Sequence, residues 1–151
     1  SDCTGEGVAT LAAALTPHAI VSIFRRVRAS PAVCAVASVL TMTEKVRTAS
    51  TGIMRTHIEF IDASVLPVWE YLDLDIVGPR LMYSYTYLDA QGNLRFRYDN
   101  IDHYRRLHLP THPRHKHDDN QNAIVASAAP RLDTVLAEVE LVVEICSQVT
   151  R

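Results

Sequence analysis

Residues 83–100 read YSYTYLDAQGNLRFRYDN, and the fold can be deduced outward from this stretch. Three tyrosines occupy alternate positions over 83–87, as expected when the side chains of a β-strand point to opposite faces. Asp89 to Asn93 form a polar loop in which Gly92 can take the positive φ of a tight turn. Alternation resumes over residues 94–98. The stretch therefore predicts a β-hairpin.

Further alternating or β-branched segments lie on both sides of this hairpin. The hairpin strands at 81–88 and 94–98 are joined by four more predicted strands, at 33–43, 53–61, 65–72 and 123–126. Because short turns separate most of them, they predict a curved antiparallel meander of about five to six strands. Pro67 cannot donate to a ladder, so its strand is expected at the sheet edge or at a bulge. Residues 99–120 break the pattern and predict a long ordered loop that could end in a short strand.

Helical periodicity frames the strands at both ends of the chain. Thr16-Pro17 is an N-terminal cap signal, and residues 17–29 place apolar side chains on one helical face. Pro130 opens a second predicted helix that runs to about Gln148. The expected fold class is α+β, a curved antiparallel sheet packed with an N-terminal and a C-terminal helix. We expect a flexible or short helical segment over 1–16 and a single α+β domain over 17–151.

The composition excludes several classes of protein. The chain has 151 residues, of which 48% are hydrophobic and 21% charged, which is a globular balance and not that of a disordered chain. A formal net charge of −2 excludes a protein that coats nucleic acid by bulk charge. No apolar run reaches the length of a membrane span, and no basic residue precedes the apolar run at 8–15. Together with three cysteines at unpatterned spacings, these features predict a cytoplasmic protein.

Histidine is concentrated in one stretch of the chain. Five of the seven histidines fall between residues 103 and 117. Six basic residues lie between 95 and 117 against Asp99 and Asp102, whereas the last 34 residues carry six acids against two arginines. Because guanidinium groups match phosphate oxygens, the basic and histidine-rich stretch predicts contact with phosphates, and with RNA in particular.

The same stretch could supply acid–base chemistry. In an extended chain His115 and His117 point the same way. Arg95, Arg97 and Asp99 share one face of the preceding strand. Histidines that titrate near neutrality can act as general base and general acid, and arginine can stabilise the charge of a phosphoryl transition state. These groups suffice for RNA cleavage in which the 2′-hydroxyl is the nucleophile, with no metal and no cofactor.

Two other functions are open from the residues alone. His115 and His117, with Asp118 and His103, could bind a transition metal, which would indicate a metal-dependent hydrolase. A non-catalytic protein- or nucleic-acid-binding module of a mobile element would need only an open basic surface. Catalysis would instead need two histidines and an arginine that converge in a cleft.

Three further positions each have two interpretations. Tyr83 and Tyr85 could stack on nucleic acid bases, or they could form one packed face of the sheet. Glu70 lies beside Trp69 and Tyr71, where it could act as a base or pair with an arginine.

A set of motifs carries a resemblance to a known family. In order, they are a strand that ends in Glu70-Tyr71, the stretch 83–100, His103, and PTHPRHKH at 110–117. This order resembles the TumE toxins, small proteins of bacterial toxin–antitoxin pairs that are often carried on mobile DNA. The chain has Tyr104 where a second histidine is common in that family. The family pattern falls on Tyr83, Tyr85, Asp89, Gly92, Arg97, Asp99, Asn100, His103, Thr111, Pro113, His115 and His117.

The resemblance implies a growth-inhibiting toxin whose action a separately encoded antitoxin blocks. The leading hypothesis is a toxin that acts on RNA or on the translation machinery, as a metal-independent endoribonuclease. A homodimer through an exposed edge strand is a further hypothesis.

Roles can be assigned to the candidate residues on this hypothesis. His115 and His117 would be acid and base, Arg97 would clamp the transition state, Asp99 would orient a histidine, and Asn100 would hold the loop. The candidate catalytic residues are His103, His115, His117, Arg97 and Asp99, and the candidate substrate-binding residues are Tyr83, Tyr85, Arg95, Asn100, Arg114, Lys116 and Glu70.

Overall fold

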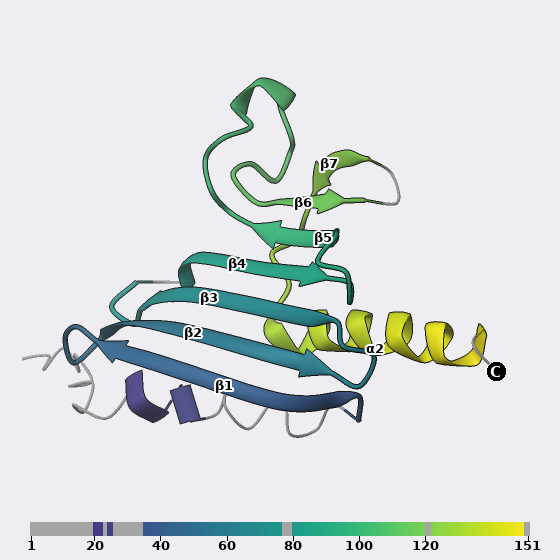
Figure 1. The fold of residues 1–151 in the computed structure, drawn as a ribbon. Coiled ribbons are helices and arrows are strands. Elements are labelled where there is room, and N and C mark those ends of the chain that lie inside the picture. Colours follow the sequence, from purple (N-terminus) through teal and green to yellow (C-terminus); the bar gives the residue numbers. More distant parts are fainter. Residues whose placement is uncertain (1–19, 23, 26–34, 77–79, 120–121, 150–151) are drawn as a thin grey trace, which may run out of the picture.

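A computed structural model describes residues 20–22, 24–25, 35–76, 80–119 and 122–149. Seven strands form one sheet in which strands adjacent in sequence pair antiparallel (Figure 1). The strands are β1 (Ala37–Val46), β2 (Thr51–Phe60), β3 (Val65–Asp73), β4 (Arg80–Leu88), β5 (Leu94–Asp99), β6 (His115–Asp118) and β7 (Ala123–Ala126). The helical elements are α2 (Leu132–Val149), the 3₁₀ turn η2 (Arg105–Leu107), and residues 20–22 and 24–25.

One face of the sheet carries the hydrophobic core. Alternate side chains of β2, β3 and β4 are buried on this face, as the period of two in a strand requires. α2 packs against it, and its Val139 and Val143 are fully buried (Figure 1). Phe24 joins the same core from the N-terminal side. A Cβ at Gly52 would lie 2.8 Å from Phe24 Cζ, so the glycine permits this close approach.

The antiparallel meander and the C-terminal helix are confirmed, with two corrections. The sheet has seven strands rather than five to six, because β6 and β7 both pair at its end. The N-terminal helix expected over 17–29 is minor in the described part, where only residues 20–22 and 24–25 are helical. The rest of that stretch and the predicted 1–16 segment lie outside the described residues.

Neither position expected for Pro67, a sheet edge or a bulge, is found, since the register shift of the described β3–β4 pair lies between Tyr71 and Leu72. β3 lies between β2 and β4, and Pro67 pairs with His57 of β2. The described β3–β4 ladder passes from Val65 to Val68, so it skips the residue that has no N–H to donate. The edge strands are β1 and β7, so a dimer formed through a sheet edge would not use β3.

The face opposite α2, which we call the open face, is formed by the other set of alternate residues. It presents Arg55, Trp69, Ser84, Arg97 and His117, one from each of β2 to β6. The open face is therefore the surface on which the polar residues predicted from the sequence can meet.

None of the helices in the described ranges is long and apolar enough to cross a bilayer.

Candidate active site

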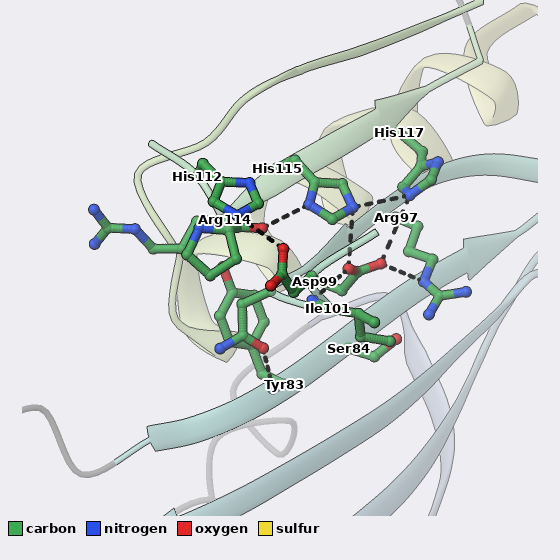
Figure 2. Close-up of polar contacts among 12 residues, drawn as sticks. Tyr83, Ser84, Arg97, Asp99, Ile101, His112, Arg114, His115 and His117 are labelled. Atoms are coloured by element: carbon green, nitrogen blue, oxygen red, sulfur yellow. Dashed lines mark hydrogen bonds and ion pairs between the residues drawn. The ribbon is translucent and has the colours of Figure 1, made fainter. Parts of the chain in front are cut away.

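Cross-strand pairing gathers four chemically active side chains on the open face. β5 and β6 pair with Arg97 opposite His117 and with Asp99 opposite His115. Because residues two apart in a strand share a face, all four side chains project to the same side (Figure 2). We call Arg97, Asp99, His115 and His117 the His–Asp cluster.

Asp99 lies at the centre of this cluster, and its side chain is only 3% exposed. Its Oδ1 accepts the backbone N–H of Ile101 at 3.0 Å and lies 3.1 Å from His115 Nε2. Its Oδ2 lies 2.8 Å from Arg97 Nε and 3.7 Å from His117 Nε2. A buried carboxylate is costly unless it is paired, and these groups provide the pairing.

His115 is the buried histidine of the pair, with 1% of its side chain exposed. Its Nδ1 lies 2.8 Å from the carbonyl oxygen of Pro113. A carbonyl can only accept, so Nδ1 donates a proton to it, and Nε2 is left to face Asp99 and His117. The two Nε2 atoms of His115 and His117 lie 3.2 Å apart. His115 therefore fixes the geometry of the cluster and has almost no surface to offer a substrate.

His117 and Arg97 form the accessible side of the cluster, with 23% and 35% of their side chains exposed. Burial lowers the pKa of His117 below its usual 6.5, and the nearby His115 and Arg97 lower it further against the opposing effect of Asp99. The imidazole is therefore neutral near pH 7 and able to accept a proton. Its Nε2 faces the cluster, so Nδ1 is the nitrogen that faces outward.

Tyr104 completes the surroundings of the two histidines, and the sequence reasoning missed it. Its ring centroid lies 5.0 Å from that of His115 and 5.4 Å from that of His117, both in edge-on geometry. The signal for this residue was its departure from the family pattern, since it occupies a position where a second histidine is common. An aromatic ring at this place limits the water around the cluster.

The loop that carries Tyr104 is held by polar contacts at its two ends. Asn100 Oδ1 accepts the backbone N–H of Tyr83 at 2.9 Å, which ties the start of the loop to β4. Asp102 accepts from the Arg105 guanidinium and lies 2.9 Å from His112 Nε2. The hydrogen bond from Arg105 is the main cause that holds the pKa of Asp102 below its usual value.

Four predicted substrate-binding residues lie on the core face instead. Tyr83 and Tyr85 are buried in the core, and the Tyr85 hydroxyl donates to the buried Glu70 carboxylate. Lys116 Nζ lies 2.7 Å from Glu138 Oε1 of α2. Because alternate residues of a strand point to opposite faces, none of the four side chains can reach a substrate at the cluster.

The remaining predicted residues lie around the cluster rather than in it. His103 is exposed, and its ring packs edge-on against Tyr104 at 6.3 Å. Arg114 is exposed and extends away from the cluster (Figure 2). Arg95 is half-buried and shares the open face of β5 with Arg97, two residues nearer the hairpin loop.

The cluster could also hold a metal ion. One carboxylate oxygen of Asp99 and one ring nitrogen each of His115 and His117 lie within 4.8 Å of one another. Converging acceptors of this kind are stable only with a proton or a metal ion among them. The Nδ1–H bond of His115 to a backbone carbonyl is the arrangement that orients histidine ligands in metal sites.

Comparison with known proteins gives one match. A family model described as Toxin TumE matches residues 23–145. No curated protein and no solved structure matches the chain. The matched range includes all seven strands, the whole His–Asp cluster and most of α2.

Proposed function

The chain belongs to the Toxin TumE family, and from this premise we propose that it is a bacterial toxin that cleaves RNA in the cytoplasm. Its action would be blocked by a cognate antitoxin protein, as the family implies. The family gives the role of toxin, and the His–Asp cluster is the basis of the proposed chemistry.

The observation that carries the proposal is the convergence of two histidines, an arginine and a carboxylate at one point of the open face. A binding module needs only an exposed basic surface, and it gains nothing from burying Asp99 and His115 beneath an accessible His117. Catalysis does need such an arrangement, because a base must be oriented by a second group and lie beside a cation. The geometry therefore favours an enzyme over a non-catalytic binder.

In the proposed reaction His117 acts as the general base. Its outward Nδ1 takes the proton of a ribose 2′-hydroxyl as the 2′-oxygen bonds to the adjacent phosphorus and the bond to the 5′-oxygen breaks. The Arg97 guanidinium stabilises the extra negative charge on the phosphoryl oxygens. The leaving 5′-oxygen takes a proton from water, and His117 returns its proton to the hydroxide that forms. The products are a 2′,3′-cyclic phosphate end and a 5′-hydroxyl end.

This assignment gives the two histidines different roles. His117 is the catalytic residue, and His115 is a positioning residue that acts through it. Asp99 pairs with both rings and with Arg97, so it holds base and cation at a fixed separation.

Inducible expression in a bacterium tests the proposal. We expect growth arrest together with RNA fragmentation from the unchanged chain, and loss of both in His117→Ala at equal soluble expression. His108→Ala is the matched control, because His108 is an exposed loop histidine outside the cluster. A fully toxic His117→Ala protein, or arrest with intact RNA, would contradict the proposal.

A metal-dependent hydrolase is the second candidate, and the three converging donors of Asp99, His115 and His117 favour it. Two imidazoles and one carboxylate suit zinc, manganese, iron or nickel. In that case His117 would be a ligand and could not be the base.

Metal analysis of the purified protein separates the two candidates. The proposal predicts no stoichiometric transition metal and full RNA cleavage after chelation. One equivalent of bound metal, with cleavage lost on chelation and restored by adding the ion, would establish the second candidate instead.

A further inference from the structure

A shallow groove of about 340 Å³ lies on the open face next to the His–Asp cluster. Its volume is within the range of small-molecule sites. Most of its lining residues have small or medium-sized side chains, and the large ones are Arg55, His57 and Trp69. The lining residues are Thr41, Thr43, Arg55, Thr56, His57, Pro67, Val68, Trp69, Ser84 and Thr86.

The strand register makes this groove continuous with the cluster. Arg55 of β2 pairs with Trp69 of β3, Trp69 with Ser84 of β4, and Ser84 with Asp99 of β5. These residues form one row across the sheet, which continues to His115 of β6. At the usual strand spacing, Trp69 lies roughly 10 Å along this row from Asp99.

The side chains of the groove suit a nucleobase. Trp69 is half-buried and presents a large aromatic surface on which any base can stack. Arg55 is exposed, and it makes no ion pair with the part of the chain that the structure describes. None of the lining residues is acidic. A base on Trp69 would therefore have a guanidinium on each side, Arg55 at one end of the row and Arg97 near the other.

We propose that this groove binds a base of single-stranded RNA, stacked on Trp69, next to the phosphate at the His–Asp cluster. The inference rests on the proposed function, because it assigns the substrate class of that same site. A duplex would not fit this role, since its bases are already stacked on one another. The contact to Trp69 is tolerant of sequence, so the groove would select for single strands more than for a particular base.

Trp69 is the only tryptophan of the chain, so its fluorescence reports on the groove directly. The experiment titrates a short single-stranded RNA into the His117→Ala protein, in which the proposed cleavage is blocked. We expect saturable quenching of Trp69 fluorescence. Anisotropy of the same RNA with a fluorescent label should show roughly tenfold weaker binding by His117→Ala/Trp69→Ala.

Two controls make the result specific to the groove. Leu141→Ala removes an exposed apolar side chain from α2, far from the open face, and should leave RNA affinity unchanged. A duplex of the same sequence should bind without quenching Trp69. Circular dichroism of each variant confirms that a lost affinity is not a lost fold.

The outcomes separate this inference from the proposed function. If RNA binds without quenching Trp69, and binds the Trp69→Ala variant with equal affinity, the groove is not the RNA-binding site. The chemistry proposed for the His–Asp cluster would be unaffected by this result. Trp69 quenching by RNA that the unchanged protein never cleaves would support the groove and overturn the proposed function. Quenching by an antitoxin segment, with none by RNA, would overturn the groove as an RNA site.

Discussion

At the scale of single residues, the proposed chemistry rests on the difference between His115 and His117. Both side chains leave β6 on the same face, and this could be predicted from their spacing alone. Their unequal exposure could not be predicted, because it depends on contacts made by the preceding loop, such as that of the Pro113 carbonyl with His115. Sequence periodicity gives the direction of a side chain but not what covers it.

The position of Arg97 beside His117 leads to a prediction about pH. Burial, then His115 and Arg97, lower the pKa of His117, so Arg97→Gln should raise that pKa. The acid limb of the RNA cleavage profile should then move to higher pH, and the rate should fall by roughly 10²–10³-fold as the transition-state contact is lost. A pH–rate profile and NMR titration of the His117 ring measure the two effects.

Arg106→Gln is the matched control for this change, because it removes an exposed guanidinium from the 3₁₀ turn η2, outside the cluster. It should keep both the rate and the acid limb of the unchanged protein. An acid limb that moves to lower pH in Arg97→Gln would contradict the electrostatic coupling.

At the scale of elements, β6 shows that candidate site residues can be predicted from the sequence even where the strand that carries them cannot. Its four residues, His115–Asp118, contain no apolar side chain, so no hydrophobic alternation marks it. The hairpin at 83–98 has clear alternation and a glycine turn, and its strands were predicted within a residue or two of β4 and β5. The two histidines of the candidate site therefore lie in the strand with the weakest periodic signal.

Because alternate side chains of β6 point to opposite faces of the sheet, Lys116 lies on the core face, where its role is structural. Its Nζ lies 2.7 Å from Glu138 Oε1, and the Tyr98 hydroxyl donates to Glu138 Oε2 at 2.7 Å. Burial opposes the charge of Lys116, but its hydrogen bonds to Glu138 and Tyr98 raise its pKa overall. These contacts link β5 and β6 to α2 on the core face.

Glu138→Ala should therefore destabilise the protein by about 1–3 kcal/mol, because it leaves a partly buried ammonium and a hydroxyl without their acceptor. Urea denaturation measures the change. Glu144→Ala, on an exposed part of the same helix, should change stability by less than about 0.5 kcal/mol. An unfolding free energy of Glu138→Ala equal to that of Glu144→Ala would show that the link contributes nothing.

At the scale of the whole molecule, the hydrophobic core and the candidate site lie on opposite faces of one sheet. The core face packs against α2, and the open face carries the His–Asp cluster and the groove. The α+β class, the antiparallel meander and the C-terminal helix could be predicted because each rests on local periodicity. The division of polar residues between the faces depends on the register of the seven described strands, which local periodicity alone does not reveal.

The same division predicts how stability responds to acid. The pKa of His117 is lower in the folded chain than its usual 6.5, so the unfolded chain binds more protons once the pH falls below about 6.5. The unfolding free energy should therefore decrease between about pH 7 and pH 5. Asp89 and Asp102 also have lowered pKa values, but their contribution is lost only as the pH falls below about 4.

Urea denaturation across this range measures the effect, and His117→Gln isolates it. The variant has no titrating ring at this position, so its stability should change less with pH than that of the unchanged chain. An identical pH dependence in both proteins would show that His117 is not protonated differently in the folded state.

In the proposed function, the His–Asp cluster cleaves RNA without a metal, with His117 as the base. The most direct test incubates the purified protein with single-stranded RNA in the presence of a chelator and identifies the chemical ends of the products. We expect 2′,3′-cyclic phosphate and 5′-hydroxyl ends, with no cleavage where a single 2′-deoxynucleotide replaces the attacked ribose and none by His117→Ala. Products with 5′-phosphate ends that form only when a divalent metal is added would contradict it.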